Sequence, residues 1–413
     1  MSIASQLTAL EGNISNAYDM VAQRGGTVPA RKNMENLDDA IATIPSGGGG
    51  GIVVPKEVNQ NGELGPKTSA PYTFSASTAT WIPMYSLAAA FSNYKSVIDY
   101  SGGSITELDL RNVERVGDYA LRYACAGCYN LTTIRLDKLK YGNAAYAFEY
   151  AFMDCPSLIG TINLDALDTN ATGISFFNYS FSNCTGITGM SMNNIATISG
   201  QTWMQWMFYK CHNLASASMD NLTTISGANA LLCAFRETKL TTSGFFKKLT
   251  TVSGSGACQS LFTDCTSLTT ASLPKLTTVS GSSALGNIFS GCTALTTVDL
   301  PLLSSLSTAS QAMERSFQEC TSLTTASFPS LATVKGQYAL RRLFRKCTSL
   351  TTVSFPALTT ASFGSYTNTF NAMLEGCSGV TVHFPAAIQS KIGGWTDVTS
   401  GFGGTNTTVL FDL

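Results

Sequence analysis

Residues 265–281 read Cys265-Thr-Ser-Leu268-Thr-Thr-Ala271-Ser-Leu273-Pro-Lys-Leu276-Thr-Thr-Val279-Ser-Gly281, and close copies of this segment begin at Cys320 and Cys347. The first apolar position of the unit recurs from Leu131 to Val380, where nine intervals cover 249 residues, a period of about 27 to 28. A period of this length indicates a stacked array in which each unit buries its apolar face against its neighbours.

The first half of each unit carries apolar residues in the order L-x-x-L-x-L, as at Leu350, Val353 and Phe355. The last two lie two residues apart, which places both on one face of a strand. A proline follows in many units, as at Pro356, and we expect it to end the strand because it cannot donate to a ladder. A glycine often comes later in the unit, where we expect a corner with positive φ. These glycines are Gly117, Gly200, Gly227, Gly254, Gly281 and Gly336.

The second half of each unit carries Phe-x-x-Cys, as at Phe262 and Cys265. A spacing of three places both residues on one helix face, so we expect a helical segment to return the chain. The recurring cysteines predict a column of buried thiols, because buried Cys acts as a small hydrophobe. Two units depart from the pattern, one with an extra residue within 158–162 and one with Thr238 in the place of Cys. We expect loops to absorb both differences.

Catalytic chemistry, metals and cofactors are not expected. Disulfides are disfavoured because equivalent cysteines occur once per unit in a chain that we expect to be made in reducing cytoplasm. The chain has only two histidines, His212 and His383, and no tandem Cys-x-x-Cys pairs, so zinc ligands are wanting. Cys211 adjoins His212 but should face the core rather than act as a nucleophile. The carboxylates do not recur at positions that would pair them for glycoside hydrolysis.

The composition limits the class of protein. Apolar residues make up 44% of the chain and charged residues only 12%, with 25 Lys+Arg against 26 Asp+Glu. This excludes a disordered chain and argues against nucleic-acid binding, which needs a basic surplus. No apolar run is long enough for a membrane span. The first twenty residues have neither a basic start nor an apolar block, so we expect no export signal. We expect Thr and Ser in register on the strands to replace charges, which would repel between adjacent strands.

The first fifty residues predict a separate helical module. A heptad seam at Ile3, Leu7, Leu10, Ile14 and Val21 fits either a helix that oligomerises or one that packs on its own neighbour. Consecutive glycines then form a flexible linker. The expected organisation is a helical anchor or oligomerisation module at 1–46, a linker at 47–51, an N-terminal cap at 52–90, the repeat array at 91–382 and a C-terminal cap at 383–413.

Two features of the repeats suggest ligand contacts. The Thr/Ser strand face could form hydrogen bonds with carbohydrate, although Thr is also simply a good strand residue. The returning segments vary most, with one basic stretch that could meet an acidic polymer and one aromatic stretch that could stack on sugars. A solvated face and core aromatics are the respective alternatives. The candidate ligand-binding residues are Arg341, Arg342, Arg345, Lys346, Trp203 and Trp206.

The unit Phe-x-x-Cys-Thr-Ser-Leu-Thr-Thr resembles the BspA-type leucine-rich repeat of bacterial and phage proteins, over roughly residues 91–382. The resemblance implies a leucine-rich-repeat α/β solenoid with a parallel strand ladder. Residues 25–30 and 41–45 resemble the helical start of structural proteins of phages of Gram-positive bacteria. Residues 382–413 resemble the ending of similar phage repeat proteins.

These resemblances imply a phage virion structural protein, a tail fibre or head fibre, that presents a repeat rod for host-surface binding. Its expected partners are other virion proteins, through the N-terminal helices, and a host cell-surface polysaccharide or protein. We expect a homo-oligomer, with a trimer as the guess. We expect no binding to nucleic acid or to a membrane. It would assemble in the host cytoplasm and then act outside the cell. The alternatives are a bacterial surface adhesin with the same repeat and a polysaccharide-degrading spike.

Overall fold

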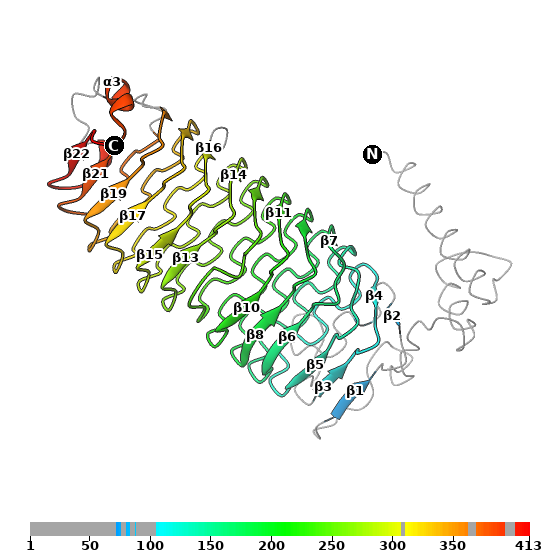
Figure 1. The fold of residues 1–413 in the computed structure, drawn as a ribbon. Helices are drawn as coiled ribbons and strands as arrows, with labels where there is room; N and C mark the ends of the chain where they lie inside the picture. Colours follow the sequence, from blue (N-terminus) through cyan, green and yellow to red (C-terminus); the bar gives the residue numbers. More distant parts are fainter. Residues whose placement is uncertain are drawn as a thin grey trace, which may run out of the picture.

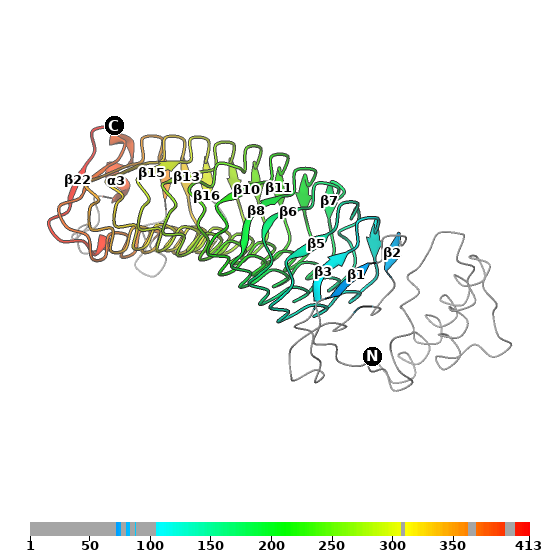
Figure 2. The ribbon, with the colours of Figure 1, turned by 90° about the horizontal axis from the view of Figure 1, so that it is seen from below.

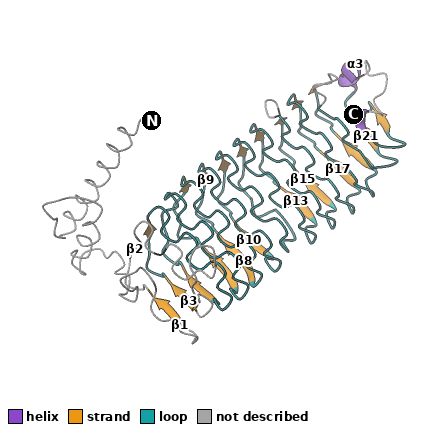
Figure 3. Cartoon of the chain, turned by 180° about the vertical axis from the view of Figure 1, so that it is seen from behind, coloured by secondary structure: helices purple, strands orange, loops and turns teal. Residues whose placement is uncertain are grey.

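The structure is a computed structural model that describes residues 72–75, 80–82, 87, 105–306, 310–361, 369–392 and 401–413. The predicted helical module at 1–46, with its heptad seam, and the predicted linker at 47–51 lie outside the described residues. The described chain is a β-solenoid of about 11 turns stacked into a rod (Figure 1). Most repeats place two short strands on the rod and return through a segment without regular secondary structure (Figure 3).

Strands of the L-x-x-L-x-L segment, with their counterparts at the two ends, form the first ladder, and neighbouring strands pair in parallel. Its sheets have the orders β1-β3-β5, β6-β8-β10, β13-β15 and β17-β19-β21-β22. The strands are β1 (Tyr72–Ser75), β3 (Ile105–Asp109), β5 (Thr133–Arg135), β6 (Gly160–Asn163), β8 (Ile187–Ser191), β10 (Ser216–Ser218), β13 (Thr270–Ser272), β15 (Thr297–Asp299), β17 (Thr325–Ser327), β19 (Thr352–Ser354), β21 (Thr381–His383) and β22 (Thr408–Leu410).

A second ladder of two-residue strands runs beside the first along the rod, and it was not among the predicted elements. It contains the pair β2-β4 and the eight-stranded order β20-β18-β16-β14-β12-β11-β9-β7. Its strands are β2 (Trp81–Ile82), β4 (Arg115–Val116), β7 (Asn170–Ala171), β9 (Thr197–Ile198), β11 (Thr224–Ile225), β12 (Thr251–Val252), β14 (Thr278–Val279), β16 (Ser305–Leu306), β18 (Thr333–Val334) and β20 (Thr360–Ala361).

The core lies between the ladders and the returning segments, and its apolar columns confirm the sequence pattern. In one repeat Leu268, Ala271, Leu273, Leu276 and Val279 are all buried. Because the strands pair in register, equivalent apolar residues of successive turns lie next to one another. Prolines follow several first-ladder strands as predicted, as Pro274 follows β13 and Pro356 follows β19.

The returning segments are not helical, which corrects the predicted α/β solenoid to a β-solenoid. In one of them Asn229, Cys233 and Glu237 have positive φ values of 52°, 56° and 59°. The N–H groups of alternate residues donate to the next turn, as from Leu231 to the carbonyl of Ala257 at 2.7 Å. The N–H groups between them close tight i→i−3 turns. A left-handed residue at every fourth position cannot continue an α-helix, and the adjacent turn satisfies the exposed backbone groups instead.

The recurring glycines also have a different cause from the one predicted. Gly227, Gly254 and Gly281 do not have positive φ. Instead, a Cβ atom on Gly281 would fall well inside van der Waals contact with the carbonyl oxygen of Gly254, and a Cβ on Gly254 would meet Gly227 in the same way. Glycine is therefore required because the backbones of successive turns approach closely at this column.

Both irregular repeats keep the stack intact. The extra residue at 158–162 produces a register shift between Gly160 and Thr161 within β6, so it is a bulge in a strand rather than a loop. Near the second irregularity the first ladder is reduced to an isolated bridge between Thr242 and Thr270. Thr238 replaces the repeat Cys and donates its hydroxyl to the carbonyl of Phe235 at 2.8 Å.

Strands from both predicted cap regions join the rod. β1 pairs with β3 and β2 with β4 at one end, and β22 pairs with β21 at the other. A 3-10 helix η2 (Ala386–Ile388) and a short helix α3 (Gln389–Ile392) lie near the C-terminal end (Figure 2). Within the described residues, no helix has the length and apolar character needed to cross a bilayer.

Candidate ligand-binding surface

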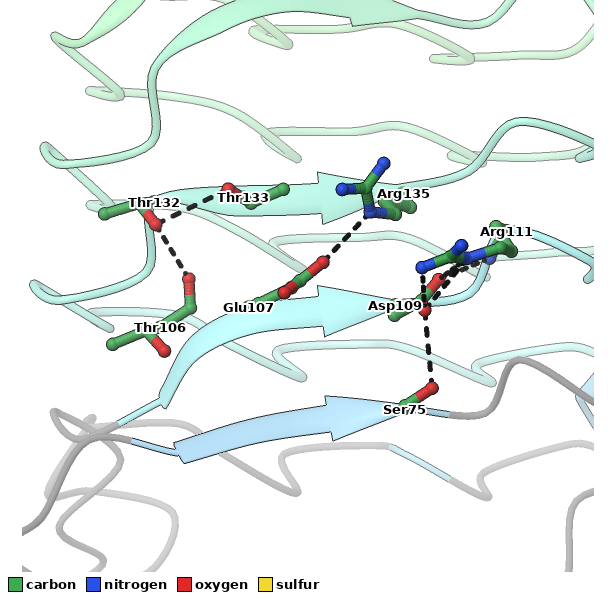
Figure 4. Close-up of polar contacts among 8 residues, drawn as sticks. All are labelled: Ser75, Thr106, Glu107, Asp109, Arg111, Thr132, Thr133 and Arg135. Carbon is green, nitrogen blue, oxygen red and sulfur yellow. Dashed lines mark hydrogen bonds and ion pairs between the residues drawn. The ribbon is translucent and has the colours of Figure 1, made fainter.

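The Thr-Thr pairs of the strands have a clear structural function. The first Thr of a pair donates its hydroxyl to a carbonyl of the preceding turn, as from Thr250 to Thr223 and from Thr277 to Thr250, both at 3.1 Å. Thr132 does the same to Thr106 at 3.0 Å (Figure 4). These bonds add side-chain links between turns to the backbone ladder. The structural explanation therefore accounts for the first hydroxyl of most pairs, and the second Thr lies in register beside its counterparts.

Charged residues interrupt the Thr/Ser pattern at the N-terminal end of the first ladder, and there they form pairs (Figure 4). The Nε atom of Arg135 lies 2.9 Å from Oε1 of Glu107 on the adjacent strand. Arg111 holds Asp109 with a closest contact of 2.6 Å, and Ser75 donates to the same carboxylate at 3.3 Å. The hydrogen bonds from Arg111 lower the pKa of Asp109. Opposite charges thus neutralise one another at this end of the ladder.

Four rings form a stacked column on the outer side of successive returning segments. Tyr123, Tyr150, Tyr179 and Trp206, called the aromatic column below, have centroid separations of 4.7, 4.9 and 5.7 Å and interplanar angles of 4°, 17° and 12°. Each ring is partly exposed. Each of the four residues also has a positive φ, between 54° and 57°. The rings therefore present their edges to solvent along the rod.

Cations and a further tyrosine flank the aromatic column. Tyr209 packs its ring edge-to-face against Trp206 with centroids 4.8 Å apart. Lys210 and Arg236 lie over the Tyr209 ring at 5.1 and 5.8 Å from its centroid, within the range of cation–π attraction. At the other end, Arg122 lies 5.3 Å from the centroid of the Tyr123 ring. These contacts hold the exposed rings in fixed orientations.

Burial raises the pKa values of the tyrosines in the column. The pKa of Tyr150 is raised to about 12, first by burial and then by the nearby charge of Glu149. Burial also raises the pKa values of Tyr123 and Tyr179. The phenol groups are therefore protonated at neutral pH, and each hydroxyl can donate and accept a hydrogen bond.

The structure separates the two predicted tryptophans. Trp203 is fully buried, its Nε1 atom donates to the carbonyl of Gly142 at 3.0 Å, and its ring stacks on Phe176 at 5.9 Å. Trp203 is thus a core residue and cannot contact a ligand, which corrects that prediction. Trp206 is partly exposed. In this segment the left-handed residues Thr202 and Trp206 are each followed by two buried residues, so a spacing of three does not place the two indoles on one face.

The predicted basic stretch comes together on the surface but is paired with carboxylates. Arg342 and Arg345 both bind Glu375, at 2.8 and 3.0 Å. Lys346 lies 3.1 Å from Glu319. Arg341 has a longer contact of 3.8 Å to Glu314 and lies over the ring of Tyr338. An acidic polymer would therefore have to compete with these glutamates for Arg341, Arg342, Arg345 and Lys346.

The described residues show no arrangement typical of an active site. No group of three or more His, Cys, Asp or Glu side chains in this part of the chain could hold a metal ion. His212 is exposed and its Nδ1 atom lies 3.1 Å from the carbonyl oxygen of Glu237, while Cys211 is buried. Burial raises the pKa of the Cys211 thiol, which disfavours the thiolate form that a nucleophile needs.

Comparison with known proteins identifies the repeat. Residues 99–230 and 233–375 match the family described as BspA type leucine rich repeat region, with 6 copies. The chain belongs to the BspA-type leucine-rich-repeat family. Such solenoids are in general binding scaffolds rather than enzymes. No curated protein matches this BspA-type chain.

Several solved structures match this chain at low similarity. A leucine-rich repeat protein from Bacteroides ovatus is 19% identical to this chain and has a TM-score of 0.34. The match spans 74% of this chain and 84% of the Bacteroides protein. A T. pallidum leucine rich repeat protein is 15% identical to this chain and has a TM-score of 0.26. The match spans 66% of this chain and 88% of the T. pallidum protein. An internalin from Listeria monocytogenes is 13% identical to this chain and has a TM-score of 0.22. The match spans 75% of this chain and 76% of the internalin.

The repeat cysteines of this BspA-type rod form the predicted buried column. All twelve cysteines of the chain are free and buried. The repeat thiols donate to carbonyls of the preceding turn, as from Cys265 to Phe235 at 3.1 Å and from Cys347 to Phe317 at 2.9 Å. The column therefore links turns through hydrogen bonds in addition to filling space.

Cys265→Thr is expected to flatten the fall in stability at alkaline pH. The pKa of Cys265 is raised to about 11 in the folded chain, chiefly by burial, against about 8.5 for an ordinary thiol. Folding thus favours the neutral thiol, whose contribution is present below that ordinary value and is lost as the pH rises toward the folded one. Between these values the variant should lose about 1.4 kcal/mol less per pH unit than the parent.

Urea unfolding at several pH values between 8 and 11, with reductant, measures this difference. The comparison between variant and parent cancels the titration of tyrosines and lysines, and Thr is the residue that the repeat of Thr238 already carries. Parallel pH profiles for the two chains would contradict the expectation.

Glu375→Gln is expected to strengthen retention of the BspA-type rod on an anionic resin such as heparin. The change releases Arg342 and Arg345 from their shared carboxylate. The free energy of unfolding should change by less than about 1 kcal/mol, because ion pairs near the surface contribute little. The salt concentration at elution is the measurement. Glu107→Gln changes the net charge equally at the opposite end, and identical elution of both variants would count against a basic binding site.

Proposed function

We propose that this BspA-type rod is a phage virion structural protein, a tail fibre or head fibre, that presents its returning segments to the host surface. The observation that carries the proposal is the contrast between the faces of the rod. Both ladders repeat Thr and Ser in register, whereas equivalent outward positions of the returning segments carry residues as different as Trp206 and Arg342. A scaffold of constant faces with one variable face suits recognition.

The virion role is supported by the resemblance of residues 25–30, 41–45 and 382–413 to segments of phage structural proteins. The proposed partners are other virion proteins, bound through the N-terminal module, and a polysaccharide or protein of the host surface. Several rods on one particle would add avidity even if each site binds weakly.

Antibodies against the purified rod test this placement on phage particles and bacterial cells separated from one culture of the source. Immunogold label on the fibres of phage particles is the expected result. Label confined to the surface of the cells would instead establish the alternative, a bacterial surface adhesin, which family membership also allows. Cleavage of host polysaccharide by the purified protein would establish the third alternative, a degrading spike.

Removal of residues 1–51 is expected to reduce the oligomer to a monomer. The heptad seam at Ile3, Leu7, Leu10, Ile14 and Val21 is proposed to join copies of the chain, with a trimer as the guess. Light scattering of the full chain and of a chain that begins at Ile52 gives the two masses. A truncated chain that keeps the same number of subunits would show that assembly lies elsewhere.

A further inference from the structure

We propose that the aromatic column, together with Tyr209, is a contact strip for a neutral polysaccharide that lies along the rod axis. This inference rests on the proposed function, since it names the host component that the returning segments would recognise. The strip extends over four successive turns and is continuous, because each ring of the column stacks on the next.

The fold does not require aromatic residues at these positions. Five equivalent positions in later turns, of which the one at Cys233 is buried, adopt the same left-handed backbone, with φ values between 52° and 56°. They carry Cys233, Ser260, Asn287, Arg315 and Arg342. A left-handed conformation disfavours bulky side chains and favours Asn or Gly. Tyr and Trp therefore occupy the column against the local backbone preference, which points to a function for the rings.

The chemistry of the strip matches a sugar chain. Stacked rings present their edges, and each tyrosine of the column adds a protonated hydroxyl that both donates and accepts. The hydroxyls of a sugar have the same dual character. Tyr and Trp also combine an apolar body with a polar tip, which suits a ligand that alternates C–H and O–H groups. The repetition of the rings along the rod suits a chain of repeated units rather than a single small molecule.

The charges near the strip favour a neutral ligand. Arg122 is paired with Glu149 at 2.7 Å, and Arg236 with Asp264 at 3.0 Å. Lys210 lies over the Tyr209 ring. The larger cluster of basic residues lies instead at 341–346, several turns away, where it is itself paired with glutamates. A polyanion and a neutral glycan would thus bind different parts of the rod.

A printed array of bacterial surface polysaccharides, neutral and anionic, tests the proposal with the full chain. We expect retention on at least one neutral glycan. The double variant Tyr150→Asn with Tyr179→Asn should reduce that retention at least tenfold, and Asn is compatible with the backbone because Asn287 occupies an equivalent position. Tyr338→Asn is the matched control, since it removes a partly exposed, left-handed tyrosine outside the column.

Each outcome is decisive once unchanged thermal unfolding has shown that the variants fold. Loss of retention in the double variant alone supports the strip. Retention on no neutral glycan, retention on anionic polymers only, or equal retention by the double variant overturns it.

The array also distinguishes this inference from the proposed function. Immunogold label on phage particles, with no retention of the protein on neutral glycans, would overturn the contact strip and keep the virion role. Glycan retention by a protein found only on bacterial cells would overturn the virion role and keep the strip.

Discussion

Phe262→Ala is expected to lower the free energy of unfolding by about 3–5 kcal/mol, the usual cost of removing a buried aromatic ring. Phe262 is fully buried and stacks between Phe235 and Phe289 at centroid distances of 5.8 and 5.5 Å, with interplanar angles of 9° and 2°. The change would leave a cavity and remove both ring pairs, each of which contributes beyond burial alone. Phe262 belongs to a column of stacked rings that includes Phe208 and Phe317, so the cavity would interrupt it in the middle of the rod.

The position of the damage distinguishes a stacked rod from a globular core. In a repeat protein each turn contacts only its neighbours, so hydrogen exchange should accelerate most in the turns around Phe262 and less toward the ends. Urea unfolding followed by circular dichroism gives the total loss. Phe262→Leu, which keeps most of the apolar volume, is the control and should cost clearly less. A uniform rise in exchange along the chain, or equal loss in both variants, would contradict the stacked-column account.

The sequence was sufficient to predict the apolar columns because their residues recur in register. Leu268, Ala271 and Leu273 repeat at a fixed period, and a parallel array places equivalent residues side by side whatever the path between them. The prolines and the buried thiols followed from the same repetition. The path of the returning segment did not, because Phe-x-x-Cys has the same spacing in a helix and in a series of tight turns.

What decides between those two paths is a contact between turns, which a single repeat does not contain. The N–H of Leu231 finds its acceptor at Ala257, in the next turn, whereas in a helix it would find one four residues earlier. Backbone propensity also argued against the observed path, since Tyr, Trp and Arg are unusual in the left-handed region. The fold overrides that preference because alternate N–H groups of the segment bond to the neighbouring turn.

The sequence indicated only one member of the aromatic column, for a related reason. Trp206 is predicted because it is aromatic in a variable segment, whereas Tyr123, Tyr150 and Tyr179, which complete the column, are not predicted. The available signal was their spacing, since the intervals between successive members are close to the repeat period. Pairing of the basic stretch could not be predicted, because Glu375 and Glu319 lie in neighbouring repeats from Arg342 and Lys346.

Gly281→Ala is expected to destabilise the rod by about 3 kcal/mol, at the upper end of the cost of overpacking. Gly281 has an ordinary φ, so backbone conformation alone would make Ala favourable by about 0.4–1 kcal/mol through the unfolded chain. The added Cβ would instead overlap the carbonyl oxygen of Gly254 in the preceding turn. The obstacle is the backbone carbonyl of Gly254, which lies two residues after β12 and accepts the N–H of Ala257 at 3.2 Å in its own corner, so it cannot move without disturbing that corner.

The sign of the effect is therefore the test. Thermal and urea unfolding of Gly281→Ala should show a clear loss of stability. Ser280→Ala, a change at the exposed position just before it, should leave stability within about 0.5 kcal/mol of the parent. Gly254→Ala should behave like Gly281→Ala, because it would meet Gly227 in the same way. A gain in stability from either glycine variant would mean that the turns are not held as closely as the column of glycines requires, and the in-register stack itself would then be wrong.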